Sequence, residues 1–231
     1  MQNLIADKED TEQVFHIIEA LNGGSTRKDF MRFMASENGP RLLEQRSFLP
    51  DILDDHAPLK SLPVGTVGRT YVEFMEREGL TAHGLVEESL SNRQEHENFD
   101  DDLLWYVNRL RDTHDMYHVL TGYGRDALGE DALLGYTHGQ HGGLGISFIA
   151  FMGNRQIAKM APKAARVRDV LAEGRRNGKA AKRIVEEDIV SLLDQPIDQV
   201  RKRLNIAKPV LYRQALEVFR ENEQDPQLVA A

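Results

Sequence analysis

Two histidines four residues apart, with an aspartate directly after the first, are the side chains best suited to chemistry. They lie in HDMYHVLTGYGRDALGE, which spans residues 114–130. Residues four apart on a helix are neighbours, so the imidazoles of His114 and His118 can reach one ion. Asp115 lies about 100° around the helix from His114 and could be a third ligand or could orient one. The spacing predicts a metal site.

Glu130 is the candidate ligand on the far side of a turn. Gly122 and Gly124 interrupt the helical pattern, and Asp126 is suited to cap the next helix. A turn of this length lets the following helix fold back, so we expect the Glu130 carboxylate to face the histidines. Imidazoles and carboxylates together suit Zn²⁺, Fe²⁺, Mn²⁺ or Co²⁺, and the spacing does not separate these divalent metals.

Three other interpretations of the histidine pair remain open. Helical cores also carry histidines whose hydrogen bonds are satisfied within the protein. Zinc metalloproteases use HExxH, and here Asp115 stands where that motif has glutamate. HD-type phosphohydrolases need another upstream histidine and a distant aspartate, and His83 and His96 are available. We expect His138 and His141, in THGQH, to be surface or structural residues rather than ligands.

Helical periodicity dominates the chain. The apolar stripe of the longest expected helix, about 101 to 121, passes through Leu103, Val107 and Leu110 to both histidines. Prolines at 40, 50, 58 and 63 predict a loop-rich stretch over 40–65. No alternating strand or linker is evident, so we expect an all-α, single-domain helical bundle over 1–231, with the metal site between two consecutive helices. The other helices are expected at about 11–21, 28–34, 65–79, 126–152 with interruptions, 158–173, 180–193 and 211–221.

Composition excludes several classes of protein. The 231 residues are 41% hydrophobic and 29% charged, which is typical of a folded globular chain rather than a disordered or membrane-spanning one. The absence of cysteine excludes disulfides and thiolate metal ligands. The net charge of −8 argues against general nucleic-acid binding. The start, MQNLIADKEDTE, fits neither a secretory signal nor a transit peptide, so we expect a bacterial cytoplasmic protein.

Charge and apolar residues are unevenly distributed. Residues 155–183 hold ten bases and two acids, and we expect this basic run to meet anionic lipid. Residues 87–102 hold seven acids and one base, as a solvated face would. LGISFIAFM, residues 144–152, is too short to span a bilayer and is expected to be buried core or, second, a wall for an apolar ligand. Gly135, Gly139 and Gly143 are each four apart and permit close helix packing.

Three segments together resemble one known family. His114, Asp115 and His118, followed after eleven residues by Glu130, match the signature of the ubiquinone biosynthesis family that is fourth in the Coq series. LPVGTVGRTYVEFM (62–75) and PIDQVRKRLNI (196–206) also resemble family text. The resemblance covers about 35–210. It departs where the family often has Trp inside the motif, because this chain has Tyr117.

The resemblance implies a helical protein that binds a divalent metal at these four residues. It implies oxidative decarboxylation, with hydroxylation, at C1 of a polyprenylated 4-hydroxybenzoate-type precursor, a lyase-type activity. It also implies a peripheral place on the inner membrane and other ubiquinone biosynthesis proteins as partners. The alternative is a non-catalytic prenyl-lipid-binding scaffold that organises those enzymes. A homodimer remains open, and about ten residues at each end are expected to be flexible.

Overall fold

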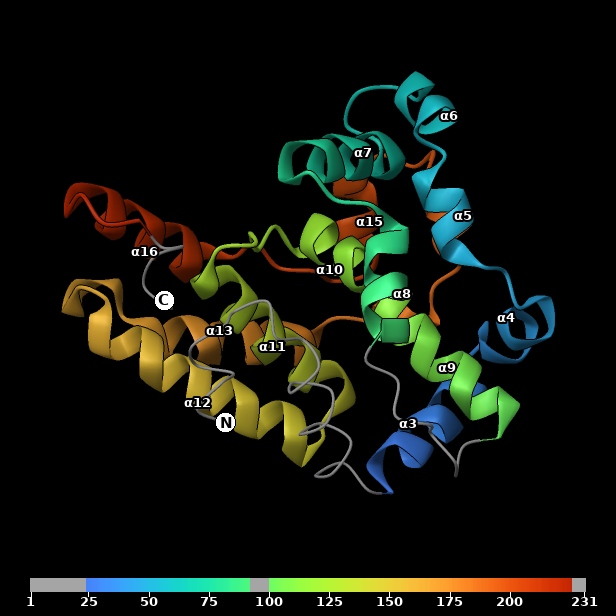
Figure 1. Cartoon of the computed structure of the whole chain (residues 1–231), viewed down its shortest axis with the longest axis horizontal. Helices are drawn as coiled ribbons and strands as arrows, with labels where there is room; N and C mark the ends of the chain where they lie inside the picture. Colours follow the sequence, from blue (N-terminus) through green and yellow to red (C-terminus); the bar gives the residue numbers. More distant parts are fainter. Residues whose placement is uncertain (1–23, 92–99, 226–231) are drawn as a thin grey trace. The chain divides into compact units, whose positions relative to one another are not determined.

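The computed structural model describes residues 24–91 and 100–225, and within these ranges every regular element is a helix (Figure 1). The one strand-like feature recorded there is an isolated bridge between Thr66 and Pro196. This confirms the all-α prediction. The helix expected at 11–21, the N-terminal residues expected to be flexible, and the last six residues lie outside the described part, as does 92–99 of the acidic stretch.

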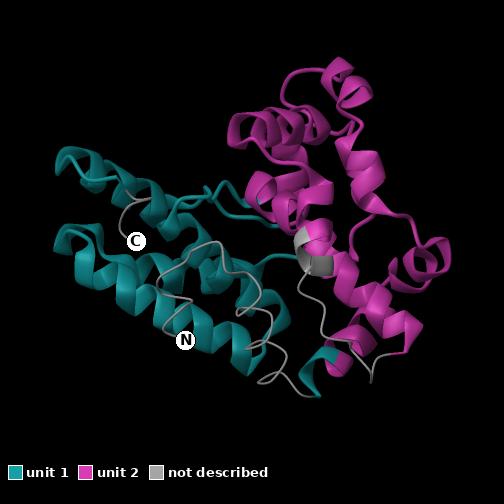
Figure 2. Cartoon of the chain, in the orientation of Figure 1, with its two compact units in different colours: residues 1–26, 121–182, 205–231 teal, residues 27–120, 183–204 magenta. Residues whose placement is uncertain are grey.

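The chain divides into two compact units (Figure 2). Unit 1 comprises residues 1–26, 121–182 and 205–231, and unit 2 comprises residues 27–120 and 183–204. The prediction that the whole chain is one domain stays a prediction.

Unit 2 contains most of the short helices. The loop-rich prediction for residues 40–65 is wrong, because three short helices lie there. Pro40 and Pro50 each stand in the first turn of one of them, where a missing N–H is tolerated. The helices are α3 (Ser25–Met34, which begins at the boundary), α4 (Gly39–Gln45), α5 (Leu49–Asp54), α6 (His56–Ser61), α7 (Val67–Glu78), α8 (Ala82–Ser91), α9 (Asp101–Asp112), α10 (His114–Thr121), η2 (Ile184–Glu186), α14 (Ile189–Leu192) and α15 (Ile197–Arg203).

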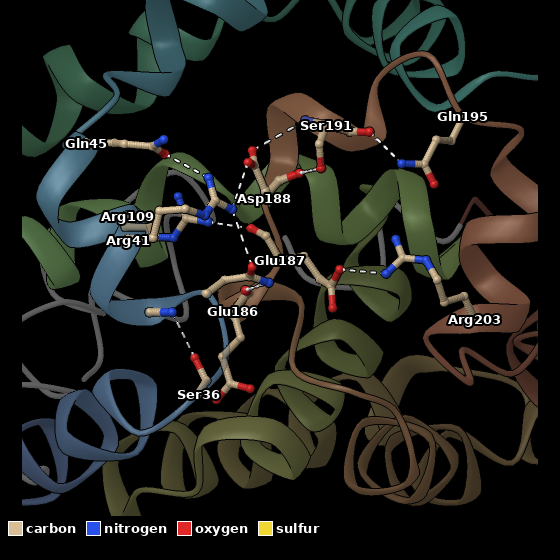
Figure 3. Close-up of polar contacts among 12 residues, drawn as sticks. Ser36, Arg41, Gln45, Arg109, Glu186, Glu187, Asp188, Ser191, Gln195 and Arg203 are labelled. Atoms are coloured by element: carbon tan, nitrogen blue, oxygen red, sulfur yellow. Dashed lines mark hydrogen bonds and ion pairs between the residues drawn. The ribbon is translucent and has the colours of Figure 1, made fainter.

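Two buried arginines connect the second stretch of unit 2, residues 183–204, to its first stretch, residues 27–120. Arg109 is 4% exposed, and its guanidinium donates to the carbonyls of Val185 (2.9 Å) and Glu187 (2.6 Å) (Figure 3). Arg183 pairs with Asp29 at 2.6 Å. The helix expected over 180–193 is therefore wrong, since these carbonyls bond to side chains far away in the sequence. Arg183 must also be removed from the basic run expected to face lipid.

Unit 1 is built from longer helices: α11 (Ala127–His141), α12 (Leu144–Met160), α13 (Val167–Ala180) and α16 (Val210–Glu221), with η1 (Lys163–Ala165) before α13. The helix expected over 158–173 is wrong. Its first residues end α12 and its last begin α13, and Pro162 lies between the two helices.

Glycines allow α11 and α13 to pack closely. A Cβ atom on Gly139 would lie 2.5 Å from the Arg175 oxygen, and one on Gly178 would lie 2.0 Å from the Tyr136 oxygen. The close packing predicted at Gly135 and Gly139 is confirmed. Gly143 has another role. It lies directly before α12 with a φ of 93°, a left-handed conformation that favours glycine.

Gly178→Ala should destabilise unit 1, because the added methyl meets backbone. Overpacking of this kind costs about 1–3 kcal/mol, against a gain of about 1 kcal/mol in helix propensity. Gly153→Ala, on α12, is the matched control, since its Cβ would meet its nearest neighbour at an ordinary 3.6 Å. Urea unfolding followed by circular dichroism measures both variants. Equal stability of the two would contradict the close packing.

The apolar segment 144–152 is only partly core. Ile149 and Ala150 are buried, but Leu144 is 74% exposed and Phe151 is 59% exposed. The prediction of buried core therefore holds for Ile149 and Ala150 but not for Leu144 and Phe151, because α12 presents part of its apolar surface outward. Among the described helices, none combines the length and apolar character needed to cross a bilayer.

Candidate metal site

Three of the four predicted ligands lie together on α10. One ligand atom from each of His114, Asp115 and His118 can be chosen so that all lie within 4.8 Å of one another. The two imidazole centroids are 4.9 Å apart, and His114 Nδ1 lies 3.5 Å from Asp115 Oδ1. His118 is 1% exposed, whereas the His114 side chain is 43% exposed. Two imidazole nitrogens and one carboxylate oxygen at this separation fit a divalent transition ion.

The single helix predicted over about 101 to 121 is two helices in the structure. Its outer limits agree with the prediction, but Thr113 separates α9 from α10, so the helix that carries the cluster is shorter than expected. The Thr113 hydroxyl donates to the Arg109 carbonyl at 2.8 Å, which supports the break. Both histidines lie beyond Thr113, so their spacing along one helix face is kept.

Helix α7 borders the cluster with aromatic side chains. The Phe74 ring stacks on the His118 imidazole, with centroids 5.6 Å apart and planes 20° apart. The Arg77 guanidinium carbon lies 5.3 Å from the centroid of Phe74. Burial, followed by the negative charges of Asp115 and Asp54, raises the pKa of Tyr71. Its phenol therefore stays protonated near the cluster.

The segment that follows α14 contacts both α10, which carries His118, and α7, which packs against His118. Ile197 N donates to Gly65 O and Gly68 N donates to Leu193 O, both at 2.8 Å. Arg201 Nε donates to Leu120 O at 2.9 Å, at the end of α10. Sequence reasoning missed Phe74 and Arg201 as site residues, although each lies in a segment that carried the family resemblance.

Glu130 lies in the first turn of α11, after a turn fixed by hydrogen bonds. The predicted cap is confirmed, since Gly129 N donates to Asp126 Oδ1 at 3.0 Å. The Tyr212 hydroxyl also donates to Asp126, and burial raises the pKa of that carboxyl. Glu130 Oε1 lies 3.6 Å from Arg125 Nε. Because Glu130 belongs to unit 1 and the histidines to unit 2, its approach to them stays a prediction.

The remaining histidines fall into different settings. His83, on α8, pairs with Asp54 at 2.6 Å and with Asp51 at 3.0 Å. His138 is half-buried on α11, where burial and the Arg175 charge lower its pKa. His96 lies outside the described residues. Across 24–91 and 100–225, the group on α10 is the cluster of three or more His, Asp or Glu side chains that could hold a metal ion.

The His83 contact should make stability depend on pH. The hydrogen bond to Asp54 raises the pKa of His83 above its usual 6.5. Burial acts to raise the pKa of Asp54, but hydrogen bonds from His83 and Ala82 outweigh it and lower that pKa below 3.8. The histidine's stabilisation is full below pH 6.5 and is lost as pH rises through its raised folded-state pKa. The carboxylate's stabilisation is full above pH 3.8 and is lost as pH falls through its lowered folded-state pKa.

Unfolding of the wild type and of His83→Gln, measured from pH 5 to pH 9, tests this. The stability difference between them should shrink as pH rises, and the His83 imidazole should titrate above its usual pKa by NMR. A constant difference across that range would contradict the account.

The structure therefore defines an all-α protein that carries, on one helix, a His-Asp-His cluster that could hold a metal ion. The chain belongs to the family of coenzyme Q (ubiquinone) biosynthesis proteins Coq4, whose pattern matches residues 5–210. The family resemblance seen in the sequence is therefore confirmed.

Relatives carry the same family name. The mitochondrial ubiquinone biosynthesis protein COQ4 of Ajellomyces capsulatus is 29% identical over 196 residues, and that of Penicillium rubens is 26% identical over 193 residues. Each alignment covers 83% of this chain, and the chain spans 66% and 64% of those relatives' lengths. A crystal structure from Nostoc punctiforme, provisionally named for ubiquinone biosynthesis, has a TM-score of 0.60 at 19% identity and covers 80% of this chain and 82% of its own. At that identity the likeness shows the fold alone.

Proposed function

We propose that this chain is a metal-dependent ubiquinone biosynthesis protein that acts on a polyprenylated 4-hydroxybenzoate-type ring. The reaction removes the carboxyl group at C1 and places a hydroxyl there. The observation that carries the proposal is the group of three ligand atoms within 4.8 Å on α10, in a chain of the Coq4 family.

The proposed site is held by His114, Asp115 and His118, with Glu130 as the fourth ligand. Three or four protein ligands leave room for a substrate oxygen at the metal. When bound, a redox-active ion of the set Fe, Mn or Co would supply activation of oxygen, which Zn²⁺ cannot. The half-exposed side of His114 is the approach that the substrate ring would take.

The residues around the proposed site orient its ligands. The Phe74 ring stacks on the His118 imidazole and fixes its plane, so that the ring nitrogen points in one direction. Asp115 is 6% exposed and either binds the ion or orients His114. In the balanced overall reaction, Ar–COOH and O₂ take up two electrons and two protons from a reductant and give Ar–OH, CO₂ and H₂O. The bond from C1 to the carboxyl carbon breaks, and a C1–O bond forms.

The proposal places the protein peripherally on the inner membrane of a bacterium, beside other ubiquinone biosynthesis proteins. A prenylated substrate resides in the bilayer, so the enzyme must approach that surface. Exposed bases on and after α13 (Arg175, Arg176, Lys179, Lys182) and the exposed apolar residues of α12 support this, since basic and apolar surfaces bind anionic membranes.

Product analysis tests the activity. Protein purified without oxygen is analysed for metal, loaded with Fe²⁺, Mn²⁺, Co²⁺ or Zn²⁺, and given a prenylated 4-hydroxybenzoate, O₂ and a reductant. Mass spectrometry should find a product in which hydroxyl replaces carboxyl with at least one of the metals. Substrate recovered unchanged with every metal would contradict the decarboxylase.

The second candidate is a non-catalytic scaffold that binds prenyl lipids and organises the biosynthetic enzymes. The exposure of Leu144 and Phe151 on α12 favours it, because an apolar surface of this kind can receive a lipid tail. A scaffold should bind prenyl lipid and partners equally well with and without metal. An enzyme should lose turnover when the ligands are replaced while it keeps those partners.

A further inference from the structure

The C-terminal end of α10 is closed by an arginine from another part of unit 2. The last four carbonyls of a helix have no donor within the helix, and burying them without a partner is unfavourable. Val119 is 4% exposed and Leu120 is fully buried, so water does not easily replace a donor there. Arg201 Nε donates to Leu120 O at 2.9 Å, and Arg201 Nη2 donates to Val119 O at 3.1 Å.

Arg201 is itself held in place by its own helix. It lies on α15, whose Val200 is fully buried and whose Ile197 is 8% exposed. Its Nη1 also lies 3.3 Å from Asp198 Oδ1. A guanidinium fixed on a packed helix can serve two carbonyls at once, which the single ammonium of lysine does less well.

The same segment also holds α7. Ile197 N donates to Gly65 O, and Val67 N donates to Gln195 O at 3.0 Å, at the start of α7. Helix α10 carries His118, and α7 carries the Phe74 ring that stacks on it. In Figure 1, α15 lies beside both helices within unit 2. One short segment therefore fixes both elements that orient the buried imidazole.

We propose that Arg201 is a positioning residue for the metal site, an inference that rests on the proposed function of that site. The last turn of α10 begins at His118. Without the guanidinium, two buried carbonyls lose their donor and this turn loosens, so that His118 no longer keeps its direction toward the ion. A positive charge at this end also complements the helix dipole.

Metal titration of the full chain tests the role. Co²⁺ and Zn²⁺ affinities are measured against a competing chelator for the wild type, Arg201→Met, Arg201→Lys and Lys202→Met, well below each unfolding temperature. Arg201→Met should bind Co²⁺ about 10–100-fold more weakly, as loss of an outer partner of a metal ligand does. Arg201→Lys should fall in between, and the exposed Lys202→Met should match the wild type. The visible absorption of bound Co²⁺ should change in Arg201→Met, since a merely structural role would leave the ligand geometry of folded molecules intact.

The outcomes separate the two claims. If the wild type binds Co²⁺ and folded Arg201→Met binds it equally with an unchanged spectrum, the positioning role is overturned and the metal site stands. If the wild type binds neither ion, both are overturned. If Arg201→Met does not fold, Arg201→Lys and Arg201→Gln decide, because wild-type affinity in both overturns the role and weaker binding in both supports it.

Discussion

His118→Ala is expected to lower the affinity for Zn²⁺ or Co²⁺ by more than about 100-fold while the helix content stays near that of the wild type. Four-ligand zinc sites bind with about 10–16 kcal/mol, so one ligand contributes about 3 kcal/mol or more, which is over about 100-fold in affinity. His118 is the more buried of the two imidazoles, and no other side chain on α10 can take its place in the cluster. Calorimetric titration of the metal-free protein measures the loss.

The matched control is His138→Ala, a histidine of α11 that lies outside the cluster. It should bind metal as the wild type does, whereas His114→Ala and Glu130→Ala should act in the same direction as His118→Ala. Asp115→Asn should weaken binding, because an amide neither ligates nor orients as a carboxylate does. If both His114→Ala and His118→Ala kept the metal stoichiometry of the wild type, the assignment of the metal site to α10 would be wrong.

Binding to anionic vesicles should be abolished when Arg175, Arg176, Lys179 and Lys182 are all replaced by Glu. These four side chains are exposed, three on α13 and one just after it. Each base near an anionic surface contributes about 1 kcal/mol, so removing four lowers binding by about 4 kcal/mol before the added repulsion. The attraction decays within a Debye length of about 8 Å, so binding by the wild type should also weaken steeply with salt.

A variant with the same total charge keeps this test specific. Lys202, Lys208, Arg213 and Arg220 are also exposed and lie outside the basic run, so their joint replacement by Glu changes the net charge equally. Sedimentation with phosphatidylserine-containing and with neutral vesicles measures both variants. The control should keep most of its binding to anionic vesicles. Equal wild-type affinity for neutral and anionic vesicles, or no binding to either, would mean that the basic run is only a solvated face.

The local features of the site follow from spacing along the chain. Two histidines at i and i+4 share a helix face whatever their surroundings, and Asp126 caps α11 because an aspartate before a helical pattern accepts from its first turn. The glycines of α11 likewise indicate a close neighbour by their interval. Their partners, Gly174 and Gly178, sit on α13 with the same interval and were not singled out.

The features that the sequence could not predict depend on contacts between residues far apart in the chain. Arg183 looks like one more base of a basic run, but Asp29, 154 residues away, holds it in the core of unit 2. Residues 180–193 show a helical pattern, yet Arg109 donates hydrogen bonds to two of their carbonyls, those of Val185 and Glu187. Arg201 and Phe74 reach the motif helix by tertiary packing, which periodicity does not encode. In the sequence, the only feature that included these two residues was the family resemblance of segments 62–75 and 196–206.

Release of labelled CO₂ tests the central claim most directly. A prenylated 4-hydroxybenzoate labelled at the carboxyl carbon is incubated, with O₂ and a reductant, with metal-loaded wild type, chelator-treated wild type and His118→Ala in parallel. The account predicts labelled CO₂, matched mole for mole by the hydroxylated product, from the metal-loaded wild type alone. Equal release from all three samples, or none from the metal-loaded wild type, would contradict it.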